Sequence, residues 1–243
     1  MHLIYEGEGV PERRAHGGDF IGPSSVSLEI RNIIPLDIDS NTPNINNPYT
    51  VTDKADGLRK LLFISKTGRI YLINTNMKVQ FTGSTTKHKM CHNTILDGEH
   101  VLHDKAGKFI NLYLCFDIYY KNNENMKGFP FYKVENLHYV NKDMDKNTFR
   151  VTELGKFLKS LDNKCVIRNF PSELSIKAKT FYHNQTDSIF SQCKIILDGE
   201  ATEMFEYETD GLIFTPADKS VGSDKTGVIT APKKTTWHYS LKW

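Results

Sequence analysis

The chain has 243 residues, with 31 lysines and arginines against 29 acidic residues, and 39% of its residues are hydrophobic. A chain of this length buries about 70% of its unfolded surface, so it needs neither disulfides nor a metal ion to fold. No apolar run reaches the roughly 20 residues that span a bilayer, and residues 1–10 lack the features of a secretory signal. We therefore expect a soluble, intracellular protein with no membrane partner.

Residues 1–48 are rich in glycine, proline and asparagine, and we interpret them as an irregular N-terminal segment. After them, residues 61–64 and 70–73 are rich in apolar side chains that favour strands. Residues 65–68 read SKTG, which is typical of a hairpin turn with glycine at a positive φ. Further strand-like runs follow at residues 94–96, 101–102 and 109–120. These elements predict an antiparallel sheet.

Residues 121–148 are polar and are interrupted by a glycine and a proline, which predicts a surface insert. Apolar residues then recur at helical spacing behind Thr152 and again behind Asp187. This pattern predicts two amphipathic helices, the second with Gly199 as its C-cap. Strands are also predicted at residues 176–182 and 212–214. The fold class is therefore α+β, and we expect one domain over residues 1–243.

The string KADGLR at residues 54–59 carries the strongest chemical signal. Lys54 stands at the mouth of the predicted hairpin, and Gly57 would let the backbone approach a ligand closely. A lysine amine has an ordinary pKa of about 10.4, so it becomes a nucleophile at neutral pH only beside cations, in a desolvated site or near a metal. Taken alone, the string also fits an ordinary turn.

Three further strings follow KADGLR in order, LDGE at residues 96–99, YLCFD at 113–117 and DGLIF at 210–214, and LKW ends the chain. The set resembles the ordered motifs of the covalent nucleotidyltransferases, which include mRNA capping guanylyltransferases and the ATP-dependent DNA and RNA ligases. The segment FIGPSSVSL at residues 20–28, KADGLR and DGLIF are more similar to capping enzymes than to ligases. The many asparagines and the polar insert favour a relative from a large DNA virus of the poxvirus or asfarvirus kind, located in the host cytoplasm or the virion.

The resemblance implies an antiparallel-sheet nucleotidyltransferase domain of the ATP-grasp-like type found in ligases and capping enzymes. The family motif reads Lys-Trp-Lys and leads into an OB-type lid domain, whereas this chain ends at Trp243. We therefore expect a catalytic core with the OB domain missing. The parent protein is expected to carry flanking triphosphatase, OB-fold and methyltransferase domains.

The resemblance also implies a role for each motif residue. Lys54 would attack the α-phosphate of GTP, release pyrophosphate and carry GMP through a phosphoramidate bond until the 5′-diphosphate end of an RNA takes it. Asp56 and Gly57 belong to the same GTP-binding motif. Arg59 would contact the ribose or the acidic residues beside it.

The remaining motif residues would bind the base, the phosphates and a metal ion. Glu99 would contact the ribose or a divalent cation, and Phe116 would stack on the guanine ring. Asp210 would help to hold the cation, while Lys179 and Lys242 would neutralise phosphate charge. The cofactor implied is Mg²⁺ or Mn²⁺, with Glu99 and Asp210 as its ligands.

Alternatives remain at three points. A second ILDGE string ends the second predicted helix, so Glu99 rather than Glu200 is assigned to the site. Five histidines and cysteines lie between residues 88 and 103, and both residue types are zinc ligands. Their spacing matches no zinc finger, so the interpretation as surface histidines is favoured over a zinc site. The chain could instead be the adenylation domain of an ATP-dependent DNA or RNA ligase, or a catalytically silent nucleotide- or RNA-binding module.

Overall fold

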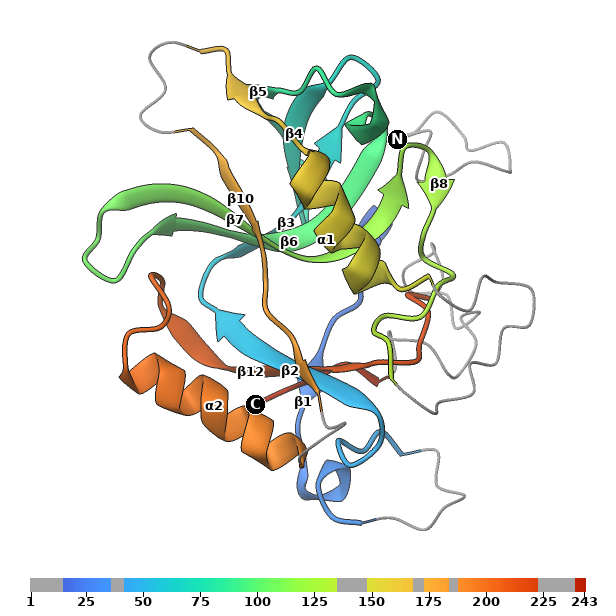
Figure 1. The fold of residues 1–243 in the computed structure, drawn as a ribbon, viewed down its shortest axis with the longest axis vertical. Helices are drawn as coiled ribbons and strands as arrows, with labels where there is room; N and C mark the ends of the chain where they lie inside the picture. Colours follow the sequence, from blue (N-terminus) through green and yellow to red (C-terminus); the bar gives the residue numbers. More distant parts are fainter. Residues whose placement is uncertain (1–14, 36–41, 135–147, 168–172, 184–187, 223–238) are drawn as a thin grey trace.

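The computed structural model describes residues 15–35, 42–134, 148–167, 173–183, 188–222 and 239–243. Two β-sheets and two α-helices make up this part of the chain (Figure 1), which confirms the α+β class. Beside these sheets, the described ranges contain no separate OB-type barrel. None of the helices in them is long and apolar enough to cross a membrane.

The larger sheet has eight strands and forms the upper part of the molecule in Figure 1. Its strands are β3 (Leu58–Ile64), β4 (Arg69–Asn74), β5 (Val79–Thr85), β6 (Thr94–His103), β7 (Phe109–Lys121), β8 (Glu124–Asn125), β9 (Lys164–Cys165) and β10 (Ser175–Ala178). The order is β10-β7-β6-β3-β4-β5-β9, and β8 pairs with β7. All pairs are antiparallel except β10 with β7.

The smaller sheet lies below the larger one in Figure 1 and has five strands. They are β1 (Val26–Ser27), β2 (Tyr49–Ala55), β11 (Tyr182–His183), β12 (Thr209–Pro216) and β13 (Leu241–Lys242). Their order is β1-β13-β12-β2-β11, and only the pair of β1 with β13 is parallel.

Each sheet is covered by one helix. In α1 (Arg150–Ser160), Leu154 and Phe157 are buried in the core beneath the larger sheet. In α2 (Ile189–Ala201), Ile189 and Ile196 are buried against the smaller sheet, and the Ser188 hydroxyl accepts a hydrogen bond from the Ser191 backbone as an N-cap. Three short 3-10 helices complete the described elements: η2 (Gly17–Asp19), η3 (Ile30–Asn32) and η4 (Lys89–Cys91).

The predicted hairpin is confirmed, because β3 and β4 pair around a turn in which Gly68 has a φ of 80°. The predicted antiparallel sheet is also confirmed, because the runs from residue 61 to residue 120 pair antiparallel in the larger sheet, and the smaller sheet is a second one that this prediction did not include. The runs at residues 94–96 and 101–102 are parts of one strand, β6. The run at residues 176–182 divides into β10 and β11, which lie in different sheets.

The predicted helix boundaries also differ from the observed ones. Gly199 is not the C-cap of α2, because the helix continues to Ala201 and Glu203 takes the positive φ of 59° that usually favours glycine. The first helix begins at Arg150 rather than behind Thr152. Residues 1–14, 36–41 and 135–147, which belong to the predicted irregular segment and polar insert, lie outside the described residues.

Candidate active site

A cleft of about 240 Å³ lies between the two sheets. Both sheets contribute to its walls, and so does the connection from β10 to β11. The lining residues are Pro23, Ser25, Thr52, Lys54, Ala55, Asp56, Gly57, Arg59, Glu99, Phe116, Asp117, Tyr119, Phe131, Lys179, Phe181, Ile213, Thr215 and Ser240. Seven of the nine predicted site residues are therefore in one cleft: Lys54, Asp56, Gly57, Arg59, Glu99, Phe116 and Lys179.

The chain passes from the smaller sheet to the larger one within the KADGLR string. Strand β2 ends at Ala55 and β3 begins at Leu58, so only Asp56 and Gly57 lie between the sheets. A Cβ atom at Gly57 would lie 2.8 Å from Cγ of Glu99, which is closer than such carbon atoms approach one another. Glycine at this position therefore allows β6 to pass directly beside the crossing.

Lys54 belongs to β2 of the smaller sheet and lies just before β3, the first strand of the hairpin. Its ammonium group forms an ion pair with the Asp210 carboxylate on β12. Gly211 next to Asp210 has a φ of 130°, and a Cβ there would meet the Trp243 carbonyl oxygen at 1.9 Å. Glycine at position 211 therefore lets the backbone of β12 beside Asp210 lie directly against the backbone of Trp243.

A second ammonium group, that of Lys179, lies behind Lys54. The Lys179 side chain is only 4% exposed, and its Nζ is 2.8 Å from Oδ2 of Asp53, which is itself buried. The Tyr207 hydroxyl donates a hydrogen bond to the same carboxylate at 3.1 Å. Burial lowers the pKa of Lys179, and the Asp53 charge opposes that change. Asp53 therefore holds a desolvated cation at the cleft wall.

Burial strongly perturbs the protonation of Glu99 in the cleft. Burial raises its pKa from 4.5 to about 7, although the positive charges of Lys179 and Arg59 act in the opposite direction. A carboxyl group with such a pKa lacks compensation for its lost hydration. Binding of a cation in the cleft would supply that compensation.

Glu99→Gln is expected to stabilise the protein at high pH relative to the unchanged chain. When the pKa of an acid is higher in the folded than in the unfolded protein, the folded protein loses stability as the pH rises between the two pKa values. For Glu99 this range runs from about 4.5 to about 7. The difference in unfolding free energy between variant and unchanged protein should grow from pH 4.5 to pH 8 by up to about 3 kcal/mol. Urea unfolding at both pH values measures it, and an unchanged difference would contradict the assignment.

Arg59 is fully engaged by groups of the protein. Its Nε and Nη2 donate to the two oxygens of Asp97 at 3.1 and 2.5 Å, and Nη1 donates to the Pro23 carbonyl. The guanidinium also lies over the rings of Phe20 and Phe116, 5.4 Å from each centroid. Burial lowers its pKa, but the Asp97 charge and hydrogen bonds outweigh burial and raise it.

One of the acidic residues beside Arg59 is Asp97, and the predicted contact of Arg59 with the ribose stays a prediction. The buried Tyr119 hydroxyl donates to the same Asp97 carboxylate at 2.5 Å. The guanidinium is therefore a fixed cation that orients Phe116 and joins the N-terminal segment at Pro23 to β3.

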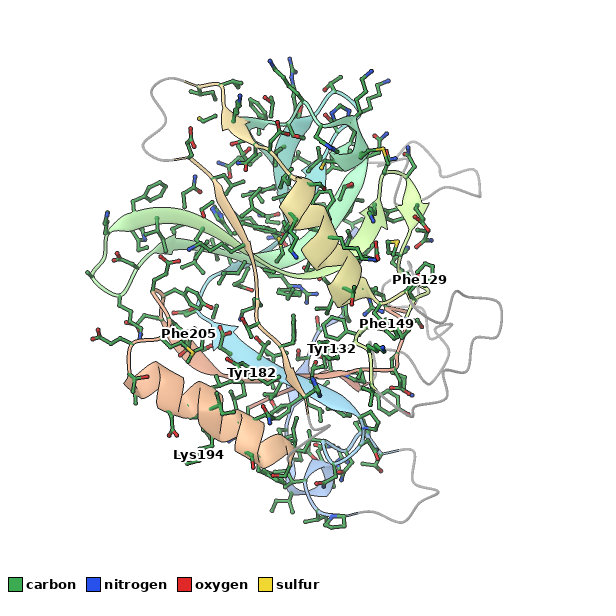
Figure 2. All side chains as sticks on the ribbon, viewed as in Figure 1. Phe129, Tyr132, Phe149, Tyr182, Lys194 and Phe205 are labelled. Carbon is green, nitrogen blue, oxygen red and sulfur yellow. The ribbon has the colours of Figure 1, made fainter. Side chains whose placement is uncertain are left out.

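Phe116 and Asp117 of the YLCFD string line the cleft, and Asp117 is anchored from behind it. Nε and Nη2 of Arg150, the first residue of α1, donate to Asp117 at 2.8 and 3.0 Å. The Arg150 side chain is fully buried and lies 5.3 Å from the Phe131 ring centroid. Figure 2 shows Phe129 and Phe149 beside this end of α1, so the aromatic residues near 130 attach the loop to the core.

Two predicted site residues lie apart from the lining set. Asp210 reaches the cleft only through its ion pair with Lys54. Lys242 is exposed on the short strand β13, where it pairs with Ile213 and Ser27, and its role stays a prediction. The described residues contain no group of three or more histidine, cysteine or acidic side chains placed to hold a metal ion.

The motif strings already contained two partners whose roles were missed. Asp97 belongs to LDGE and Asp117 to YLCFD, and both turn out to be buried carboxylates paired with arginines. Asp53 directly precedes Lys54, but its neighbour Lys179 is distant in sequence. No local sequence pattern predicted that Arg150 would pair with Asp117.

Comparison with known proteins gives one family. The family model for the mRNA capping enzyme, catalytic domain, matches residues 15–229. A probable mRNA-capping enzyme of Acanthamoeba polyphaga mimivirus is 26% identical over 221 residues, and an mRNA-capping enzyme of Danio rerio is 26% identical over 208 residues.

The matched region is a small part of these relatives. It covers 78% of this chain and 18% of the mimivirus protein, and 82% of this chain and 30% of the Danio rerio protein. Among solved structures, the ligase domain of LigD from M. tuberculosis is 12% identical, with a TM-score of 0.44 over 80% of this chain and 53% of that one.

Proposed function

The chain belongs to the mRNA capping enzyme family, as its catalytic domain, and from this we propose that it is a GTP–RNA guanylyltransferase whose nucleophile is Lys54. The amine of Lys54 attacks the α-phosphorus of GTP, the bond from that phosphorus to the bridging oxygen breaks, and pyrophosphate leaves. The terminal phosphate oxygen of a 5′-diphosphate RNA then attacks the same phosphorus, and the phosphorus–nitrogen bond breaks. GMP is thereby transferred to the RNA and the amine is regenerated.

The observation that carries this proposal is the gathering of Lys54, Arg59 and Lys179 in one cleft. Phosphoryl transfer is accelerated mainly by positioning and by neutralising phosphate charge, so the cations Arg59 and Lys179 around the amine of Lys54 suit the reaction. Burial desolvates Lys179 while Asp53 favours its charged form, and a cation in surroundings of low dielectric constant interacts more strongly with a phosphate. Phe116 offers an aromatic face, held by Arg59, on which a base can stack.

Magnesium, or manganese, fits the acidic residues of the site. Mg²⁺ retains several waters and takes one or two protein carboxylates together with substrate phosphates, so it does not need a set of three protein ligands. Glu99 and Asp210 would hold it, and the raised pKa of Glu99 suits a carboxylate that receives a cation. When bound, the cation supplies charge neutralisation at the phosphate oxygens.

Incubation with labelled GTP or ATP, each with magnesium, tests the function. When GTP is supplied, intact mass and a denaturing gel should show an acid-labile adduct of the protein with GMP. Addition of RNA with a 5′-diphosphate end should remove the GMP from the protein. A labelled protein adduct that forms with ATP but not with GTP would indicate a ligase-type adenylation domain instead. Binding of GTP with no adduct would indicate a silent nucleotide-binding module.

The relatives are several times longer than this chain. We propose that triphosphatase, OB-fold and methyltransferase domains accompany the catalytic domain in the complete protein. Repeating the GTP assay with the corresponding longer chain measures how much such domains contribute to the rate of adduct formation.

A further inference from the structure

Exposed cations gather at the end of the larger sheet that lies farthest from the smaller sheet. Backbone pairing brings their segments together, because Thr85 pairs with both Arg69 and Lys164. In Figure 2, side chains that end in nitrogen project from the top of the view, where β4 and β5 lie in Figure 1. We call this set the far-end cations: Lys66, Arg69, Lys87, Lys89, Lys159 and Lys164.

The far-end cations carry an excess of positive charge that the neighbouring acids do not balance. Within the described ranges, none of the six forms an ion pair. Asp162 at this end accepts a hydrogen bond from Thr86, and Glu153 is already paired with Lys121 and Lys156. A local field of one sign attracts a polyanion, although the net charge of the whole chain is only +2.

A row of aromatic side chains runs across β3, β4 and β5 beside the far-end cations. The Phe63 and Tyr71 ring centroids are 6.4 Å apart with planes at 27°, and those of Tyr71 and Phe81 are 5.4 Å apart at 49°. All three residues are half-buried, so part of each remains accessible. We call these residues the aromatic row. Rings of this kind are the platforms on which single-stranded bases stack.

The aromatic row lies on the same sheet face as the cleft. Side chains alternate along a strand, so Arg59, Leu61 and Phe63 of β3 share one face, and Phe63 packs on the cluster that contains Leu61. The same alternation on β4 puts Arg69 beside Tyr71. At about 3.3 Å a residue, the far end of β3 at Ile64 lies about 17 Å from Arg59, a distance that a few nucleotides span.

We propose that the aromatic row and the far-end cations bind the single-stranded RNA that follows the 5′ end held in the cleft. Bases stack on the row, and the phosphates beyond it approach Lys66 and Arg69. The cations alone would suit any polyanion, but half-buried rings beside them, on the sheet face that also carries Arg59, favour RNA over an acidic peptide. The identity of the cleft occupant rests on the proposed function, whereas binding to this surface does not require catalysis.

The double variant Lys66→Glu/Arg69→Glu tests the charge contribution, and Lys105→Glu/Lys108→Glu is its matched control. The control residues are exposed in the turn between β6 and β7, away from the far end, and both variants change the net charge equally. Binding of a 5′-diphosphate RNA of about 20 nucleotides should weaken about tenfold in the far-end variant only, and the slope of log K against log salt should fall by about 1. Tyr71→Leu should weaken binding without changing that slope.

Catalytic assays separate this proposal from the proposed function. GMP adduct formation should be unchanged in the far-end variant. The KM for GMP transfer should rise for the RNA of about 20 nucleotides but not for one of about 3 nucleotides, which is too short for a binding groove. If neither the unchanged protein nor the double variants form a GMP adduct, the proposed function is wrong, whereas the result of the RNA-binding measurement remains valid. Equal weakening in both double variants, or loss of binding to a polyglutamate peptide but not to RNA, would overturn the proposal.

Discussion

Lys54→Ala is expected to abolish the GMP adduct, with a loss of about 1,000-fold or more, as removal of the nucleophile gives in other covalent enzymes. No other described lysine can replace it, because the Nζ of Lys179 is buried and engaged by Asp53. Intact mass after incubation with GTP and magnesium measures the loss. Folding should be little affected, since the Lys54–Asp210 ion pair is partly exposed and such pairs contribute about 0–1 kcal/mol.

Two further variants separate nucleophilic chemistry from charge. Lys54→Arg keeps a positive charge that can pair with Asp210, but a guanidinium is always protonated and should form no adduct. Lys177→Ala is the matched control, because Lys177 is exposed in an ion pair with Glu206 two residues before Lys179. An adduct that persists in Lys54→Ala would place the nucleophile elsewhere.

Arg150→Ala is expected to destabilise the protein by about 3–5 kcal/mol. Its guanidinium is fully buried, holds both oxygens of Asp117 and also donates to the carbonyls of Phe129 and Lys219. Removing it leaves a buried carboxylate uncompensated, which costs more than the pair itself contributes. Burial already raises the pKa of Asp117 against the effect of Arg150, so the acid should take up a proton in the variant.

Chemical denaturation of Arg150→Ala beside Lys156→Ala measures this cost. Lys156 lies on the same helix, is exposed and pairs with Glu153, so its removal should change stability by less than about 1 kcal/mol. Equal effects of the two substitutions would show that the buried pair has no special role. Adduct formation in Arg150→Ala should also fall at temperatures where the variant stays folded, because Asp117 is adjacent to Phe116 in the cleft wall.

Local sequence patterns were sufficient for the elements whose pairing is local. The hairpin of β3 and β4 has its turn residues in SKTG, and the helices follow apolar residues at helical spacing, so each could be predicted from neighbours in sequence. Which sheet a strand joins is not a local property. Strand β2 is two residues from β3, yet it pairs with β12 and β11, and no pattern within β2 distinguishes these partners.

The candidate site was predicted from the order of motifs, not from periodicity. The family match confirms the resemblance to capping enzymes that this order indicated. The motifs did not reveal which side chains hold the others in place. In the pairing of β3 with β6, Arg59 is opposite Glu99, and its side chain reaches diagonally to Asp97, which had no predicted role. The role of Asp53 depends on Lys179, which the fold brings beside it from a distant part of the sequence.

The chain crosses from one sheet to the other at Asp56 and Gly57, and again between β10 and β11 beyond Lys179. Lys54 and Asp210 lie on the smaller sheet, whereas Arg59 and Glu99 lie on the larger one. Between the sheets, Ala55 of β2 packs in one buried cluster with Val101 of β6 and Leu112 of β7. This apolar spacer sets the distance from the amine to the groups on the opposite wall, so an enlarged side chain at Ala55 would misplace the nucleophile without touching a motif charge.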